Sequence, residues 1–459
     1  MYLCNLLGNV KKQVETLSVK VNVKVKVKVN VKVKVSVNIK VNVMKHHIFL
    51  LFCLLSASVF AQLPDSIYSP LVKTVTLYRD GIVLSTPILT LNNESQLLLT
   101  FDMLEAEPEN LRYRFTHCDA NWQADEMQPY EYFSGFEDYP IENFQNSFTT
   151  LQPYIHYHQA FPSNYERFLI SGNYLLTVFL DGEPDSILFT RRFYVSEEIP
   201  SASLSTSRAT TQGDFNRDQE VSLQLGLPQQ QASTLQGLFR PEYLIVKIQQ
   251  NGRRDNIHSL GFSGYANGDL CYRWKPENCF PGGNTFRYFD LSNLRTPMYN
   301  VMHVETFGGE TFAMLRPEED RSGKAYVSSQ SLNGGMKTNI WDRNDPQVEA
   351  DYVWVNFALP IKKPFLNGTV HVVGDLTDWQ LDDHSAMQWD AQHNAYTLRL
   401  LLKQVYYSYQ FHFLPVGEKT ALTATIEGDH YETPNTYTAF IYMRTPGARY
   451  DRLIKVKQQ

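Results

Sequence analysis

The chain has 459 residues, and its composition excludes several classes of protein. It carries 42 basic and 48 acidic residues, so its formal net charge is −6. A protein that binds nucleic acid or an anionic membrane mainly through charge needs a basic surface. We therefore expect no nucleic-acid partner and no direct membrane insertion. Outside the leader described below, no apolar run approaches the ~18–20 residues of a transmembrane helix.

The first 43 residues are dominated by a low-complexity tract. From Val19 to Val43 every odd position is Val or Ile, and every even position is Lys, Asn or Ser. Such alternation is typical of an amphipathic strand. A single strand over this tract would be roughly 80 Å long, at ~3.3 Å per residue, whereas strands usually have ~3–10 residues. We interpret residues 1–43 as a mis-called start upstream of the true gene.

Residues 44–61 have the pattern of a secretory signal peptide. Met44 is followed by a short basic cluster and then by the apolar run Ile48–Val59, which is too short to span a bilayer as a helix. A small residue, Ala61, ends the leader. We expect cleavage after Ala61 and export to the periplasm. Because Gln62, not a cysteine, follows the expected cut, we expect no lipid anchor.

The expected mature chain is more acidic than the whole sequence. Residues 1–61 contain ten lysines and one glutamate, so residues 62–459 keep 32 basic and 47 acidic residues and a net charge of −15. This charge favours a soluble protein that docks on a basic or neutral surface.

Three cysteines remain in the mature chain. Cys271 and Cys279 are close in sequence and lie in a stretch flanked by Pro and Gly. In an oxidising periplasm they either form a disulfide or stay as two reduced thiols, and the sequence leaves both open. Cys118 has no evident partner, and we expect it to be a small buried hydrophobe.

The composition and the spacing of turn-forming residues predict an all-β fold of tandem immunoglobulin-like β-sandwich domains. The chain has 27 Tyr, 27 Phe and 6 Trp. Gly, Pro and Asn interrupt it every ~8–12 residues, and long stretches with helical periodicity are scarce. We predict an N-terminal β-sandwich at 62–198, a middle β-rich unit with long loops at 199–346, and a C-terminal sandwich at 347–459.

Local patterns place some elements within these units. Residues 174–180 and 187–195 alternate between apolar and polar positions around a Gly/Pro turn, which predicts a closing hairpin. Residues 201–212 are polar and rich in Ser and Thr, which predicts a linker or a long surface loop. Asn251-Gly252 predicts a second hairpin turn.

The sequence contains no common catalytic motif. It has no P-loop, no G-x-G-x-x-G and no H-E-x-x-H, and the segment 261–265 has Tyr265 where a nucleophile elbow needs Gly. His156 and His158 would share one face of a strand, but they are only two metal ligands. The aspartates between 375 and 383 lack EF-hand spacing. We therefore predict no catalytic residue, no metal site and no cofactor.

Three segments resemble one protein family. The first is residues 113–122, YRFTHCDANW, and continues to Glu131-Tyr132 and Gly135-Phe136. The second combines 154–157, YIHY, with 161–162, FP, and 171–174, SGNY. The third combines 426–433, IEGDHYET, with 446–451, PGARYD. Together they are similar to the plug protein of the type IX secretion system, a periplasmic protein of Bacteroidota.

The resemblance spans nearly all of residues 64–455, and it implies a stopper that works by docking, not catalysis. The family's partner is an outer-membrane β-barrel translocon of about 36 strands. A barrel that wide has an aqueous lumen, and the plug closes its periplasmic opening. The family-motif positions, expected to be structural or to contribute to docking, are Tyr113, Phe115, His117, Cys118, Asp119, Trp122, Gly172, Tyr174, Trp379, Glu427, Gly428, Asp429, Arg449 and Tyr450.

The last predicted sandwich also resembles the early-set sandwiches of glycogen-binding domains. The resemblance lies in the segment that ends at Trp379 and in the aromatic strand through Tyr409 and Phe411. In that family the matching Trp stacks on a glucose ring. Gln410 stands where a ligand-binding Lys is common, and the second stacking Trp is missing. We expect Trp379 to be a core or edge residue, and we keep a carbohydrate-binding module as the alternative.

Overall fold

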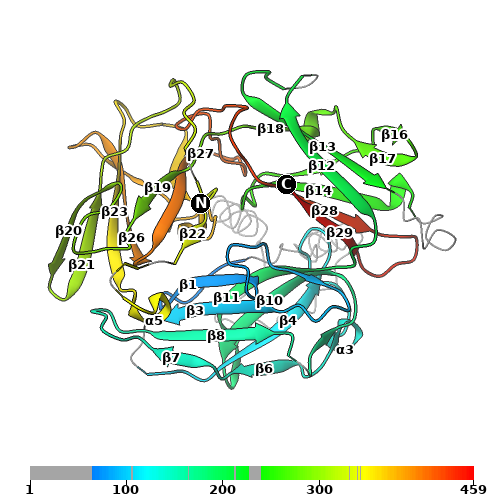
Figure 1. Ribbon diagram of the computed structural model, residues 1–459, viewed down its shortest axis with the longest axis horizontal. Helices are drawn as coiled ribbons and strands as arrows, with labels where there is room; N and C mark the ends of the chain where they lie inside the picture. Colours follow the sequence, from blue (N-terminus) through cyan, green and yellow to red (C-terminus); the bar gives the residue numbers. More distant parts are fainter. Residues whose placement is uncertain are drawn as a thin grey trace, which may run out of the picture. The chain divides into compact units, whose positions relative to one another are not determined.

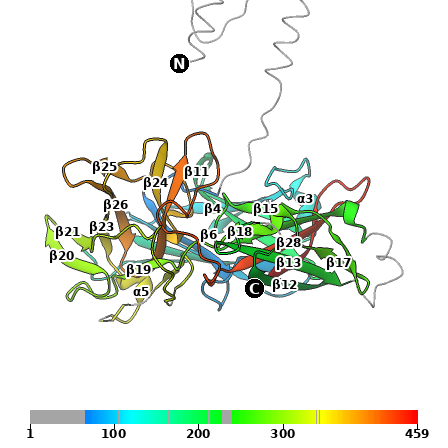
Figure 2. The ribbon, with the colours of Figure 1, turned by 90° about the horizontal axis from the view of Figure 1, so that it is seen from above.

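The computed structural model describes residues 65–104, 107–163, 165–210, 213–226, 239–329, 331–338, 340–341 and 343–459. The predicted tract and signal peptide at 1–61 lie outside this part of the chain. Nearly all regular structure in it is β, and its strands form stacked sheets (Figures 1 and 2). The all-β prediction is therefore confirmed. Most of the strands belong to one of three β-sandwiches.

The first sandwich packs a sheet of order β1-β3-β8-β7 against one of order β2-β11-β10-β4-β6. Its core forms from side chains that alternate between the two faces of each strand. In β4, Leu111, Tyr113 and Phe115 are buried, and the residues between them are partly exposed. The predicted closing hairpin is confirmed, because β10 and β11 pair with Tyr174 opposite Phe193. Its elements are β1 (Val72–Arg79), β2 (Ile88–Thr90), β3 (Leu97–Met103), β4 (Leu111–Cys118), α3 (Pro129–Tyr132), β5 (Phe133–Ser134), β6 (Asp138–Ile141), β7 (Phe144–Asn146), β8 (Ile155–Phe161), β9 (Arg167–Phe168), β10 (Gly172–Leu180) and β11 (Glu183–Ser196).

The middle sandwich combines strands from two distant parts of the sequence. One sheet has the order β12-β13-β17-β16, with β18 also on β13, and the other has the order β15-β14-β28-β29. Its elements are β12 (Ser201–Arg208), β13 (Asp218–Gly226), the 3₁₀ turn η1 (Pro241–Tyr243), β14 (Leu244–Gln250), β15 (Ile257–Leu260), β16 (Gly264–Ala266), β17 (Asp269–Tyr272), η2 (Pro276–Asn278), β18 (Cys279–Pro281), β28 (Tyr437–Met443) and β29 (Arg452–Gln458).

The third sandwich lies within the sequence of the middle one. Its sheets have the orders β19-β27-β22, with β24 also on β27, and β20-β21-β23-β26-β25. Its elements are β19 (Arg287–Asp290), β20 (Val301–Phe307), β21 (Glu310–Leu315), β22 (Met336–Lys337), α5 (Pro346–Glu349), β23 (Tyr352–Pro360), β24 (Gly368–Val373), η3 (Asp375–Thr377), β25 (Gln388–Asp390), β26 (Ala395–Lys403) and β27 (Tyr406–Pro415).

The sheets do not follow the predicted boundaries after the first sandwich, whose strands all lie within 62–198. The prediction of one sandwich over residues 347–459 is wrong at its C-terminal end, because β28 pairs with β14 of the middle sandwich. All seven residues of β28 are buried. Ile441 faces the middle core, whereas Phe440 and Tyr442 pack against the first sandwich. A strand with two apolar faces needs cover on both sides, and the position between the middle core and the first sandwich provides it.

Two smaller sequence predictions are also corrected. The Ser/Thr-rich segment starts with the edge strand β12, not a loop, because its backbone pairs with β13 while one face stays in water. The second hairpin forms, but β14 and β15 are joined by residues 251–256, so the turn is longer than a two-residue Asn-Gly turn.

The structure decides between the two alternatives for Cys271 and Cys279 in favour of free thiols. Cys271 and Cys279 lie opposite Gln224 and Glu220, four residues apart on the same side of β13. Four residues of a strand span ~13 Å, but a disulfide needs its two Cα atoms within ~7 Å. The two thiols are therefore not bonded to each other. Burial raises the pKa of the Cys279 thiol to about 11.

Candidate functional site

The first family motif begins in the core of the first sandwich. Tyr113 and Phe115 point inward from β4. The Tyr113 hydroxyl donates to Glu166 Oε1 at 2.8 Å. Phe115 contacts a group of rings whose centroids lie 5.0 to 5.6 Å away, including Phe133 and Phe193. These two motif residues are therefore structural, and neither is accessible to a partner.

His117 is the centre of a buried polar cluster at the end of β4. Its Nδ1 is hydrogen-bonded to Asp125, and its Nε2 lies 3.1 Å from the Ser171 carbonyl oxygen. Two motif tyrosines contact the ring edge-on: Tyr174 at 4.9 Å and Tyr450 at 5.6 Å between centroids. His117 therefore connects the first and third family motifs.

Gly172 is required by this cluster. Its φ is +148°, and an added Cβ would lie 2.2 Å from Nε2 of His117. The Gly172→Ala variant should therefore lose about 2–3 kcal/mol of stability, the usual cost of overpacking a core. Denaturant unfolding of the mature chain would measure this loss. Gly323→Ala, at a glycine with open space around its Cβ and no left-handed φ, is the control. Equal stabilities of the two variants would contradict this role for Gly172.

The turn after β4 carries three more motif residues. Cys118 is fully buried, and burial raises the pKa of its thiol to about 12, so it is an unreactive small hydrophobe, as predicted. Asp119 Oδ1 accepts hydrogen bonds from two backbone amides of its own turn. Trp122, at φ +63°, lies with its ring 4.4 Å from the Arg192 guanidinium and 5.4 Å from the Tyr194 ring. The turn is thereby fixed in one conformation.

This turn forms the joint between the first and middle sandwiches, which we name the first joint. The Ala120 amide donates to Asp451 Oδ2 at 2.9 Å. The Tyr442 hydroxyl of β28 donates to Asn173 Oδ1 at 2.8 Å, and Asn173 Nδ2 donates to the Asp119 carbonyl at 2.8 Å. The first two of these contacts connect residues more than 250 positions apart in the chain. They are the reason why the first and third motifs lie together.

Arginines of the third motif region complete the first joint. Arg449 forms an exposed ion pair with Glu131 of α3 at 2.5 Å, and Arg452 forms a partly buried pair with Glu197 at 2.6 Å. Exposed pairs contribute little stability. We therefore assign most of the stability of this joint to its buried contacts.

The middle and third sandwiches meet at Glu427, Gly428 and Asp429, which we name the second joint. Glu427 is fully buried and is hydrogen-bonded to Arg287 and Arg321 of the third sandwich region. Asp429 instead binds the middle sandwich, with Arg217 at 3.0 Å. Gly428, at φ +78°, permits the chain to turn between these two carboxylates. Adjacent motif residues therefore bind different sandwiches.

The first and third sandwiches meet at a third joint that sequence reasoning missed. Asp102 of β3 accepts hydrogen bonds from Lys403 Nζ and from the Tyr352 hydroxyl, each at 2.6 Å, and its other oxygen lies 2.7 Å from His156 Nδ1. The side chains of Asp102 and Lys403 are 1% and 3% exposed. His156 therefore orients a structural carboxylate, and His158 is its neighbour, not a second metal ligand. The part of the chain that the structure describes holds no metal-binding cluster.

One further cluster joins all three sandwiches, and we name it the central node. Asp65, just before β1, binds Arg254 of the middle sandwich at 2.7 Å and Arg191 of the first at 3.3 Å. Arg191 also binds Asp378 of the third sandwich at 2.5 Å. Burial raises the pKa of Asp378, against the charges of the two arginines. No motif or spacing indicates this node, because its members come from four distant segments.

Trp379 is covered and cannot stack on a sugar. Its side chain is packed against the backbone at Gly252 and Gly334, where an added Cβ would lie 2.3–2.4 Å from the indole. The indole nitrogen donates to Asp375 Oδ1 at 2.7 Å. Phe286 covers a further part of the ring, and the residue is only 9% exposed. As predicted, Trp379 is a core residue, and the basis of the carbohydrate-binding alternative is removed.

One open, shallow hollow of the described surface is lined by Arg112 and residues 136–140. Within the described ranges, no helix is long and apolar enough to cross a membrane. Large apolar side chains are nevertheless exposed at several places, including Phe136, Tyr165 and Phe307.

Tyr113 and Phe115 thus lie in the core of the first sandwich, and most of the other motif residues lie at the joints. Residues 72–197 match the family described as "Type 9 secretion system plug protein 1st domain", and they coincide with the first sandwich. The crystal structure of a hypothetical protein from Parabacteroides merdae ATCC 43184 is 30% identical, with a TM-score of 0.80, over 86% of this chain and 98% of that chain. No curated protein matches the chain. The chain therefore belongs to the type IX secretion system plug protein family.

Proposed function

We propose that the protein is a non-enzymatic periplasmic plug, which docks on the outer-membrane β-barrel translocon of the type IX secretion system and closes its periplasmic opening. Family membership supports a role associated with type IX secretion. The proposal places the mature protein, cleaved after Ala61, in the periplasm. It requires no cofactor and no catalytic residue.

The observation that carries this proposal is the set of three joints and the central node. Each pair of sandwiches is connected by at least one buried charged group, and the central node connects all three. Separating two sandwiches would break the hydrogen bonds of these groups and expose the apolar residues packed beside them, such as Phe440 and Tyr442, to water. A body that closes a wide opening must keep its dimensions under thermal motion, and such joints provide this stiffness without an active site.

Reversible docking is compatible with this rigidity. A protein interface of about 1,200–2,000 Å² gives specific binding. Cargo that engages elsewhere on the translocon could still displace the plug if the two binding events favour different translocon states. The plug would then leave as one body, without rearranging its own sheets.

Co-purification tests the proposal. The tagged protein, expressed from its own leader in a bacterium that uses type IX secretion, should bring an outer-membrane barrel protein with it from gently solubilised membranes. Deleting the gene should raise the permeability of the outer membrane to periplasmic-sized solutes. Recovery of the tagged protein without any barrel protein, together with unchanged permeability in the deletion strain, would contradict the plug function.

A further inference from the structure

We propose that the plug docks through one edge of its first sandwich, and that the partner surface there is basic with apolar pockets. This inference rests on the proposed function and deepens it. We define the aromatic edge as Phe136, Phe144 and Tyr165. The occupant that we assign to it is the periplasmic side of the outer-membrane translocon.

The aromatic edge is built on strands at the open side of the sandwich. β6 and β7 are each the last strand of their sheet, and only residues 142–143 separate them in sequence. Phe144 begins β7, and Phe136 lies two residues before β6. The chain from Phe136 to Phe144 can span up to about 26 Å. That length suits one side of a standard interface, which buries about 800 Å² per partner.

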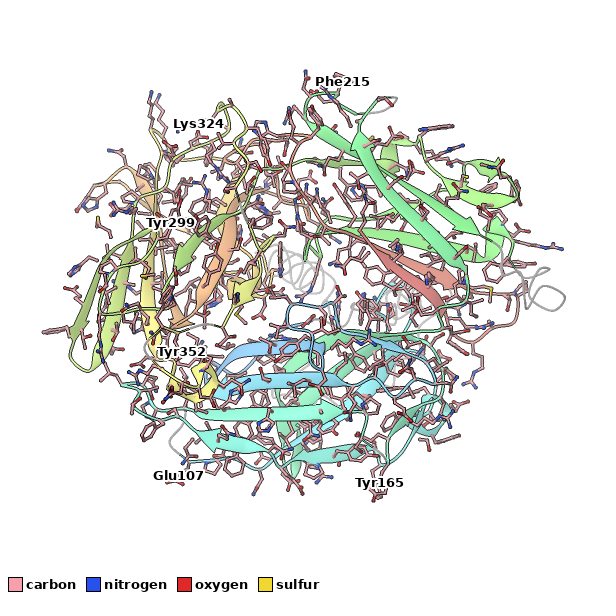
Figure 3. All side chains as sticks on the ribbon, in the orientation of Figure 1. Glu107, Tyr165, Phe215, Tyr299, Lys324 and Tyr352 are labelled. Atoms are coloured by element: carbon pink, nitrogen blue, oxygen red, sulfur yellow. The ribbon has the colours of Figure 1, made fainter. Side chains whose placement is uncertain are left out.

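Tyr165 lies on the same side through a short ribbon. β5 and β9 are antiparallel, and Ser134 lies opposite Arg167. Phe136 follows Ser134 by two residues and Tyr165 precedes Arg167 by two residues, so both extend from the same end of this ribbon. Figure 3 shows Tyr165 projecting away from the sheets of the first sandwich. The Phe136 amide donates to the hydroxyl of Tyr139 at 2.8 Å, which holds its backbone in place while the ring stays outside.

The side chains of the aromatic edge are exposed to solvent instead of packing in the core. Tyr165 is 86% exposed, Phe136 is 74% exposed and Phe144 is 43% exposed. Tyrosine and phenylalanine are enriched at the centres of protein interfaces, where they add large apolar area at low entropy cost. The shallow hollow beside Phe136 offers room for a complementary side chain. The edge therefore has the anatomy of an interface core.

Charge argues for the nature of the partner. Residues 65–198 contain 20 acidic and 7 basic side chains, a net charge of −13, whereas residues 199–459 have a net charge of −2. Almost all the net negative charge of the mature protein thus belongs to the first sandwich. The exposed carboxylates of Glu137 and Glu142 flank the aromatic edge directly. An acidic rim around aromatic rings attracts a basic surface and repels an acidic one.

A co-purification series tests this assignment. We compare the wild-type plug with Phe136→Ser/Tyr165→Ser and with the charge reversal Glu137→Lys/Glu142→Lys, all tagged and expressed from the native leader. Both variants should recover about tenfold less barrel protein, because truncating interface aromatics or reversing rim charges has effects of this size. Raising the salt concentration during washing should also lower wild-type recovery.

The matched control is Tyr265→Ser/Phe307→Ser, which removes two comparably exposed aromatic rings from the middle and third sandwiches. It should recover as much barrel protein as the wild type. Thermal unfolding of each purified variant checks that its fold is intact, as surface substitutions normally leave it.

The possible outcomes separate the two proposals. If all variants recover the barrel protein as well as the wild type does, the aromatic edge is not the docking surface, although the plug function stands. If the control variant loses recovery and the edge variants keep it, docking uses another sandwich, and the assignment is equally wrong. If the wild type itself recovers no barrel protein, the plug function fails, and the assignment fails with it.

Discussion

Replacing Glu427 by alanine is expected to lower the free energy of unfolding by about 3–5 kcal/mol, the range measured when one partner of a buried ion pair is removed. Glu427 Oε1 accepts from Arg287 Nε at 2.9 Å and from the Phe411 amide at 2.8 Å. Glu427 Oε2 accepts from Arg321 Nε at 2.7 Å. The Arg287 side chain is 3% exposed, so it cannot regain hydration after the substitution.

Glu427→Gln is the matched variant for this prediction. It keeps the shape and one acceptor oxygen but loses the charge, so we expect it to lie between wild type and alanine. Urea unfolding at neutral pH would measure all three proteins. A loss below about 1 kcal/mol for Glu427→Ala would contradict the view that this carboxylate holds the second joint.

The same residue predicts a pH dependence. Burial alone would raise the pKa of Glu427, but the charges of Arg287 and Arg321 outweigh it and lower the pKa to about 2. The folded-state pKa is below the unfolded value of about 4.3. The contribution of Glu427 to stability is therefore fully present above that value and is lost as the pH falls from about 4 through 2. The difference in the free energy of unfolding between wild type and Glu427→Gln should shrink over this range. A difference that stays constant would contradict a lowered pKa of Glu427 in the folded protein.

Replacing Asp102 by alanine is the second change with a large expected effect, again about 3–5 kcal/mol. It would leave the Lys403 ammonium, 3% exposed, without its carboxylate. The hydroxyl of Tyr352 and Nδ1 of His156 would lose an acceptor at the same time. Burial opposes ionisation of Asp102, yet Lys403 and His156 together lower its pKa, so the charged form is the stable one in the folded protein.

A double-mutant cycle would separate the pair from its surroundings. Asp102→Ala with Lys403→Met removes both charges, and an apolar replacement of a buried pair is often nearly neutral. The double variant should therefore be more stable than Asp102→Ala alone. Small-angle scattering would detect whether the single variant separates the first and third sandwiches. Additive losses in the cycle, with an unchanged scattering profile, would show that the third joint is not coupled in this way.

The sequence predicted well what depends on neighbouring residues. The alternation of apolar and polar residues in β4 shows which face of the strand is buried, and the burial pattern in the structure follows it. The hairpin of β10 and β11 needs only a short turn between two apolar strands, and it formed as predicted. The family resemblance also found residues that matter, since His117 and Glu427 each sit at a buried polar cluster.

Long-range pairing was not predictable in the same way. The last two strands look like the end of the third sandwich because they follow it in sequence, yet β28 lies beside β14, almost 200 residues earlier. Periodicity shows that both faces of β28 are apolar, but it does not name the surfaces that cover them. The third joint has the same origin, because nothing near Asp102 in the sequence points to Lys403.

By itself, the amino-acid sequence determined the class of fold, the family resemblance, the acidic charge and the absence of a familiar catalytic motif, because each of these is a property of composition or of residues close in the chain. Only the tertiary structure decided that the motif residues join sandwiches, that Trp379 is covered, and that Cys271 and Cys279 are too far apart to bond. Burial and pairing between distant segments arise when the sheets pack. They are therefore properties of the folded chain and not of any local stretch of it.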